Sequence, residues 1–341
     1  MHSERLAVAV VAIAAVGSLA ASAGEIATGL HRSIEELTPT ATIRVGKTAD
    51  WVAISDHAVW VGSSGPDAVS EIDPHTNRLV STIPLPGNPC AGLAIGHGGV
   101  WVPLCARPNA LARIDLRTLK VTLVAGIGPA DSEGGITSSS DSIWLIVDRK
   151  ATLARIDPAS GHIRQTIHVP IGSYNPLYSA GLIWVTRADG AEVTVVQART
   201  GNILGRVRSG PNPRFLTSGA GAVWTLNQGD GSLSRIDMKT RRVVQTIALD
   251  TPGHGGDIKF GGGMVWTSMS KVPLTVVDGR TGVVLCQWMG PGGDALGIGH
   301  GAIWLTNYHA GTISRIEMRE ALSRCSGTPV KSTGEASLRV H

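Results

Sequence analysis

The sequence is poor in charged and aromatic residues. Only 16% of its 341 residues are charged and 4% are aromatic, with two Phe and three Tyr. The basic residues give a net charge of +4 but are scattered, and the densest group is Lys239, Arg241 and Arg242. Nucleic-acid-binding proteins gather such residues on one face or in one run. The sequence therefore argues against nucleic acid as a partner.

Long apolar runs are missing after residue 20. Leu6–Ala20 is apolar, follows a short polar start, and precedes small residues at Ala21 and Ala23. This layout predicts a signal peptide over residues 1–23 and an exported protein, periplasmic or secreted. An uncleaved N-terminal membrane anchor is the alternative, although a span needs about 20 apolar residues. No membrane span is expected after cleavage.

Cysteine is also scarce, with four residues in the chain. None forms a Cys-x-x-Cys pair, which argues against a zinc site. An even number of cysteines in an exported chain permits two disulfides.

Glycine and tryptophan, in contrast, are used repetitively. The chain has 43 Gly and nine Trp, and seven of the Trp follow a β-branched residue at spacings of 38 to 43. These are Trp60, Trp101, Trp144, Trp184, Trp224, Trp266 and Trp304. A repeat of this length in an all-β pattern is typical of stacked structural units.

Each unit contains four short strands. After the Trp strand comes a strand of the type Leu-Ala-Arg-Ile-Asp, as at 111–115 and 153–157, then a turn such as Asp157–Gly161, then a third strand. A Gly-rich strand precedes each Trp. A four-stranded unit of about 40 residues is a propeller blade. The fold class is therefore all-β, a seven-bladed β-propeller of four-stranded blades.

The ring is predicted to close through its N-terminal strand. Residues 41–45 resemble the fourth strand of blade one, whereas 318–324 do not alternate like a strand. We therefore expect 41–45 to complete the last blade, which removes an open sheet edge. The resulting organisation is a linker or short helix at 24–40, the propeller at 41–317, and a C-terminal turn and flexible tail at 318–341.

This strand order also predicts the disulfides. Cys90 and Cys105 flank two antiparallel strands of blade two, so we expect them to pair. Cys286, on the outer strand of blade six, would then pair with Cys325 beyond blade seven. Two free thiols at 286 and 325 are the alternative.

The repeats resemble those of the streptogramin lyase (virginiamycin B lyase) family and of relatives with YVTN repeats. The resemblance covers residues 41–317 and depends on Pro-x-x-Leu-x-x-Gly-x-Gly-x-Val-Trp, best seen at 89–101 and 213–224, followed by Arg-Ile-Asp. It implies a propeller and, as an activity, a magnesium-assisted carbon–oxygen lyase. The family's His and Glu residues imply a role for His309, although the acidic position of that segment is Asn307 here.

Binding residues are expected at the mouth of the central channel. Loops before the first strand and after the second strand of each blade open on one face. The candidate ligand-binding residues are Asp50, Trp51, Tyr174, Asn212, Arg214, Asn227, Asn307 and Tyr308. Trp51 lies outside the repeat, so it is a candidate for stacking on a ligand, whereas the seven repeat Trp are expected to pack between blades.

The same loops contain the residues that could support chemistry. His309 and His254 are candidate catalytic bases, and neighbouring blades would bring their loops together. Glu133, Asp257 and Asp294 are candidate oxygen ligands for Mg²⁺. Solvated surface residues are the alternative for all five, and the residues by themselves assure no cofactor.

Two functions follow. The first is an exported propeller that binds a small molecule or a protein through its polar mouth without assured catalysis. The alternative is a magnesium-assisted lyase that acts on a cyclic ester or depsipeptide. A calcium-dependent lactonase is disfavoured because that group has six blades.

Overall fold

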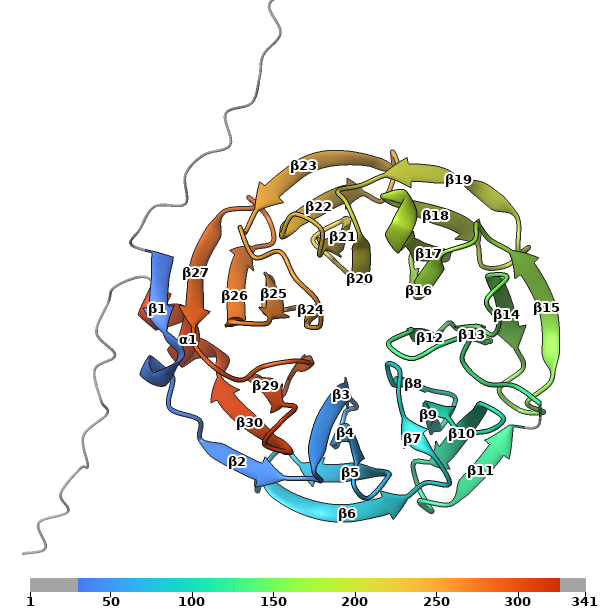
Figure 1. The fold of residues 1–341 in the computed structure, drawn as a ribbon, viewed down its shortest axis with the longest axis horizontal. Helices are drawn as coiled ribbons and strands as arrows, with labels where there is room; N and C mark the ends of the chain where they lie inside the picture. The colour runs from blue at the N-terminus through green and yellow to red at the C-terminus, as the bar shows by residue number, and fades with distance from the viewer. Residues whose placement is uncertain (1–29, 125, 326–341) are drawn as a thin grey trace, which may run out of the picture.

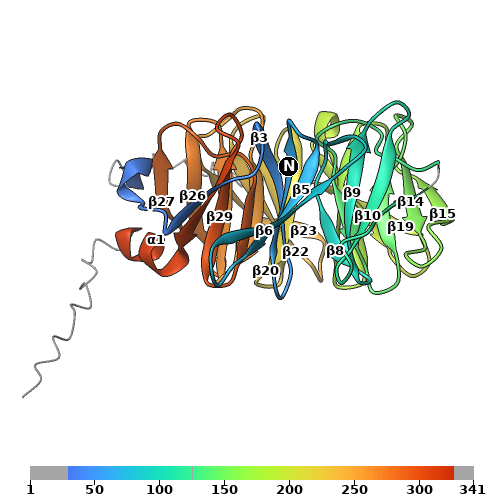
Figure 2. The same ribbon diagram turned by 90° about the horizontal axis from the view of Figure 1, so that it is seen from below.

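Seven sheets stand around a central axis, so the predicted all-β, seven-bladed propeller is confirmed (Figure 1). From the side the ring is a disc (Figure 2). The computed structural model describes residues 30–124 and 126–325. The predicted signal peptide and the last residues of the predicted tail, 326–341, lie outside this part.

The strands of each blade are numbered here from the axis outward. Blade one has β3 (Thr48–Ile54), β4 (Val59–Ser64), β5 (Ala68–Asp73) and β6 (Arg78–Pro84). Blade two has a first strand in two pieces, β7 (Asn88–Pro89) and β8 (Ala94–Gly96), then β9 (Gly99–Cys105), β10 (Ala110–Asp115) and β11 (Val121–Val124). Blade three has β12 (Ile136–Ser138), β13 (Ile143–Ile146), β14 (Thr152–Ile156) and β15 (Ile163–His168).

The next two blades are the most regular. Blade four has β16 (Ser173–Ser179), β17 (Leu182–Arg187), β18 (Glu192–Gln197) and β19 (Ile203–Arg208), with a 3₁₀ turn at Ala188–Gly190. Blade five has β20 (Pro213–Gly219), β21 (Ala222–Asn227), β22 (Ser232–Asp237) and β23 (Arg242–Ala248).

The last two blades include strands from the start of the chain. Blade six has β24 (Asp257–Gly261), β25 (Met264–Met269), β26 (Val272–Asp278) and β27 (Val284–Met289), with β1 (His31–Ser33) outside β27. Blade seven has β28 (Leu296–Gly299), β29 (Ala302–Asn307), β30 (Thr312–Glu317) and then β2 (Ala41–Arg44). Because β2 pairs antiparallel with β30, Ile43 opposite Ile313, the predicted closure is confirmed.

The repeat Trp side chains form a buried belt between the blades. All seven are at most 1% exposed and lie on the second strands. On four blades the Arg of the Arg-Ile-Asp motif, or of Arg-Ile-Glu in blade seven, lies directly opposite the Trp and covers its ring, as Arg235 does over Trp224 at 5.1 Å. The following Asp accepts hydrogen bonds from its own turn, as Asp237 does from the Thr240 N–H at 2.7 Å. The motif therefore builds the scaffold.

Both ends of the described chain pack on the outer side of blades six and seven, where the ring closes. Residues 24–40 were expected to be a linker or a short helix, yet β1 pairs in parallel with β27, His31 opposite Gln287, and a 3₁₀ helix follows at Ile34–Glu36. At the other end, the expected turn contains helix α1 (Met318–Cys325). Leu37, Trp288 and Ala321 are buried together here, so this clasp has an apolar core.

Both predicted disulfides are present. Cys90–Cys105 joins the first and second strands of blade two, and Cys286–Cys325 ties α1 to β27. Two disulfides fit an oxidising compartment. In the part of the chain that the structure describes, helices are too short or too polar to cross a bilayer.

Candidate functional site at the channel mouth

A cavity of about 710 Å³ opens at the end of the channel where the fourth-to-first and second-to-third strand loops meet. This volume is within the range of about 300–1,000 Å³ that is usual for small-molecule sites. Its walls come from blades three, five, six and seven, and they include Glu133, Arg214, Phe215, Gln228, His254, Lys271, Asp294, Asn307, Tyr308 and His309.

Several site residues occupy one repeat position. Asp50, Tyr174, Arg214 and Asp294 each lie ten residues before their repeat Trp, and Glu133 lies eleven before. The ladders of β3, β16 and β20 shift register at this position. A β-bulge re-aims the side chain that it carries. The blades therefore present a ring of different side chains toward the axis.

Arg214 is held in place by Tyr174 of the neighbouring blade. Its guanidinium stacks 3.8 Å from the Tyr174 ring and donates to the Tyr174 hydroxyl at 2.6 Å. That hydroxyl donates in turn to the Ser132 carbonyl. The backbone is fixed as well, because the Asn175 amide donates to the Arg214 carbonyl at 2.7 Å. Arg214 is therefore a preorganised cation in the cavity wall.

Two carboxyl groups, Glu133 and Asp294, lie in the cavity wall, and they act on two more, Asp50 and Asp257, that are not part of the wall. Burial raises the pKa of Asp50 to about 9, with further contributions from Asp294, Glu133 and Asp257. Burial and Asp294 also raise the pKa of Glu133, although Arg214 opposes this. Burial and Asp257 raise the pKa of Asp294, whereas the Gly256 N–H and His309 oppose this. These acids repel one another, so a cation placed among them would be stabilised.

Asp257 differs from the other acids because it already has a cation. It is 3% exposed, and both of its oxygens accept from the Lys259 ammonium, at 2.7 and 2.6 Å. With Trp51 and Phe215, this pair lines a second cavity of about 180 Å³. Trp51 therefore faces the channel below the mouth, and its ring centroid lies 6.2 Å from that of Phe215.

Both candidate histidines lie on the mouth cavity, as expected for loops of adjacent blades. Tyr308 packs edge-on against His309, with ring centroids 5.3 Å apart. Burial, and then Asp50, raises the pKa of Tyr308. The Asn307 side-chain carbonyl accepts from the Ala310 N–H at 3.2 Å, so it also caps its own loop.

Two predicted binding residues are used by the scaffold. Asn227 is fully buried, and its amide donates to Ser232 and Ser234 at 2.9 Å each. Asn212 has a left-handed φ of 51°, and its carbonyl accepts from the Gln228 N–H. Neither is part of the cavity wall.

Phe215 and Gln228 line that wall but were not among the predicted site residues. Phe215 directly follows the bulge residue Arg214, and the Gln228 amide donates to the Gly255 carbonyl at 2.8 Å. In the sequence Phe215 has the pattern of an ordinary strand residue. Only its place directly after the β-bulge, which the sequence does not show, could have indicated that it lines the cavity.

The arrangement gives no ready metal site. Among residues 30–124 and 126–325, no three His, Cys, Asp or Glu side chains converge closely enough to hold a metal ion. Asp257 is paired with Lys259, which removes one of the three expected ligands. As they stand, these residues do not fit Mg²⁺.

Together the fold and the cavity define a seven-bladed β-propeller with a polar channel mouth. No protein-family model and no curated protein matches the sequence. Among solved structures, the crystal structure of BamB from Moraxella catarrhalis is similar, with a TM-score of 0.57 and 12% identity over 83% of this chain and 100% of that chain. At this identity the likeness shows the fold alone. The resemblance to streptogramin lyases therefore has no family match behind it.

Proposed function

We propose that the protein is an exported propeller that binds a small, positively charged ligand in the mouth cavity. The observation that carries this is the position of Glu133 and Asp294 in the wall of that cavity. Asp50 is not part of the wall, but its own burial and these two carboxyls, with Asp257, raise its pKa to about 9. A buried group with such a pKa lacks the cation that would lower it again. An ammonium or guanidinium group would supply that charge, and the stacked Arg214 would meet an acidic group of the same ligand.

Calorimetric titration with 1,5-diaminopentane tests this proposal. Binding should release protons near pH 8, because the incoming cation ionises Asp50. The release is measured by repeating the titration in two buffers that differ in ionisation enthalpy. Replacement of a partner that accepts a charged hydrogen bond costs about 1.5–3 kcal/mol. We therefore expect D50N and E133Q each to weaken binding at least tenfold.

The matched control is D230N, because Asp230 is exposed on the same face, is not part of the cavity wall, and is not one of the carboxyls that raise the pKa of Asp50. This variant should bind as the wild type does. Binding that is no tighter in the wild type than in a D50N/E133Q double variant would refute the proposal.

A lyase is the second candidate, because His254, His309, Glu133 and Asp294 share one cavity. In this case one histidine would take the proton from the carbon next to a carbonyl of a cyclic ester or depsipeptide, the electron pair would form a carbon–carbon double bond, and the ester's bond from the adjacent carbon to oxygen would break, which opens the ring and leaves a carboxylate. Lyase activity is measured with and without a chelator, for the wild type and for H309A. Activity that is indifferent to both changes would exclude this candidate.

A further inference from the structure

The end of the propeller opposite the mouth has its own surface. Hairpins join the third and fourth strands there, and three neighbouring ones belong to blades four, five and six. We call residues 197–206, 237–244 and 278–284 the basic rim. Their outer strands β19, β23 and β27 follow one another around one side of the ring (Figure 1).

The basic rim exposes aliphatic side chains. Ile203, Leu204, Val244 and Val283 are between 44% and 59% exposed. Single exposed aliphatic residues need no explanation. The fourth strands of blades one to three expose Leu79, Val80, Leu123 and Ile163 as well, so the basic rim differs by the number of cations that lie beside its aliphatic residues. All four aliphatic residues of the rim lie at or near the start of a fourth strand, so they project from the same end of the blades.

Cations surround these side chains. The three segments contain six cations and only two carboxylates, Asp237 and Asp278. The cations are Arg199, Arg206, Lys239, Arg241, Arg242 and Arg280. Within the described residues, Arg206 alone among them forms an ion pair, with Glu192 at 3.8 Å. Both carboxylates accept hydrogen bonds from their own turns, and these turns lower their pKa.

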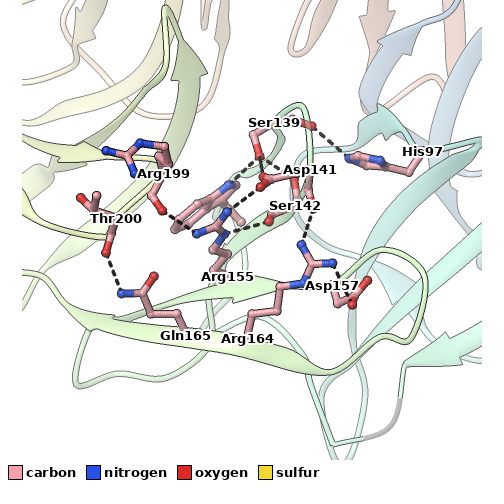
Figure 3. Close-up of polar contacts among 11 residues, drawn as sticks. His97, Ser139, Asp141, Ser142, Arg155, Asp157, Arg164, Gln165, Arg199 and Thr200 are labelled. Carbon is pink, nitrogen blue, oxygen red and sulfur yellow. Dashed lines mark hydrogen bonds and ion pairs between the residues drawn. The ribbon is translucent and has the colours of Figure 1, made fainter.

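The hairpins are held rigidly from the neighbouring blade. Arg155 donates to the Arg199 carbonyl at 3.0 Å, and Gln165 donates to the Thr200 carbonyl at 3.0 Å (Figure 3). Arg235 holds the Arg280 carbonyl in the same way at 2.9 Å. These bonds fix the backbone and leave the side chains of Arg199 and Arg280 without an ion pair in the described chain. A preorganised surface loses less entropy on binding.

The direction of the chain fits this surface. Fourth strands run from the hairpins toward the mouth, and β1 runs parallel to the fourth strand β27. The chain therefore enters β1 from the side of the basic rim, on blade six itself.

We propose that the basic rim binds the surface of an anionic phospholipid bilayer, with the mouth facing away from it. Cations attract the lipid headgroups, and aliphatic side chains enter the boundary with the acyl chains. Duplex DNA would use the cations but gives the exposed aliphatic residues no role.

Co-sedimentation with phosphatidylcholine vesicles, with and without phosphatidylglycerol, tests this proposal on the full chain. R199Q/K239Q/R242Q removes three rim cations, and K47Q/R107Q/K150Q removes three exposed cations from the mouth face. Each rim cation contributes about 1 kcal/mol, or about fivefold in affinity. The first variant should therefore bind phosphatidylglycerol vesicles about a hundredfold more weakly, and the second should bind as the wild type does.

Two further measurements locate the contact. I203S/L204S keeps the charge, and it should weaken binding about tenfold even at high salt. Hydrogen exchange should slow in the basic rim when vesicles are added. Because the apolar segment 6–20 is present in every chain, differences between variants do not come from it.

Three results would overturn the proposal. The first is equal weakening by both charge variants, and the second is binding that ignores phosphatidylglycerol. The third is tighter binding to duplex DNA than to vesicles with the same dependence on Arg199, Lys239 and Arg242.

Discussion

Carboxyl groups at the two ends of the blades behave in opposite ways. At the mouth, burial raises the pKa values of Asp50, Glu133 and Asp294. At the hairpin end, hydrogen bonds from the Thr118 backbone and the Thr240 backbone lower the pKa values of Asp115 and Asp237. All of these are carboxyl groups, and their surroundings decide the direction of the pKa shift: burial raises the pKa at the mouth, and hydrogen-bond donors of the turn lower it at the hairpins.

The difference separates scaffold from site. The hairpin Asp recurs at the same repeat position in five blades, at 73, 115, 157, 237 and 278, and it closes a turn each time. The position ten residues before the repeat Trp instead varies from blade to blade, with Asp50, Tyr174, Arg214 and Asp294 among its occupants. The constant position builds the fold, and we propose that the variable position carries the function.

The largest effect on stability is expected from a substitution in the buried Trp belt, which supports both ends of the blades. Trp224 is fully buried, and its indole N–H donates to the Gly219 carbonyl at 3.2 Å. W224A should lower the free energy of unfolding by about 3–5 kcal/mol, because a large cavity opens between blades. Urea denaturation measures this. If the two ends share this support, ligand binding at the mouth and the protection of the hairpins should be lost together.

The control is W224F, which keeps much of the buried area and loses the hydrogen bond. Its cost should be clearly smaller than that of W224A. Equal costs for the two variants would show that the hydrogen bond, and not the packing, stabilises the belt.

The fold was predictable because each blade repeats the same physical requirement. Every second strand needs a large buried side chain between blades, so Trp marks the register, and the alternating strand beside it follows. Closure through 41–45 was predictable for the same reason, since Ile43 occupies the place of Ile83. In contrast, β1 and α1 could not be predicted. They have three and eight residues, which is too few for a clear hydrophobic period.

The site was predictable only in its outline. The strand order, which is the same in every blade, predicted that the loops of His254, His309, Asp294 and Arg214 lie at the mouth, and all four residues line the cavity there. The burial of Asn227 could not be predicted from the sequence. Its hydrogen-bond partners, Ser232 and Ser234, lie on the next strand and form no motif that would indicate them. The Asp257–Lys259 pair was not predicted. The two residues are two positions apart on a strand, and such spacing is typical of ordinary polar–apolar alternation.

The second prediction changes the mouth and leaves the hairpins intact. The pKa of Asp50 is about 9 when folded and near 4 when unfolded, so the folded state keeps a proton across this range. The stability of the wild type therefore falls as the pH rises from about 4 to 9. D50N removes this cost and should be more stable than the wild type by on the order of 2 kcal/mol at pH 8. At pH 4 the two should be equal.

Thermal unfolding at both pH values measures the effect, and D230N is again the control. The opposite result, a D50N variant that loses stability at pH 8, would mean that Asp50 is ionised and paired in the folded protein.

The smallest effect is expected at the hairpin end, with the opposite dependence on pH. The Asp237 carboxylate accepts from the Lys239 N–H at 3.1 Å and from the Thr240 N–H at 2.7 Å. Its lowered pKa means that it stabilises the fold above its unfolded pKa near 4, and this stabilisation is lost as the pH falls. D237A should thus lower Tm slightly at pH 7 and leave it unchanged near pH 2. D237N should lie between D237A and the wild type at pH 7, because its side-chain carbonyl still accepts from the turn. If D237A instead raised Tm at pH 7, the hairpin acids would repel their surroundings as the mouth acids do, and the contrast between the two ends would disappear.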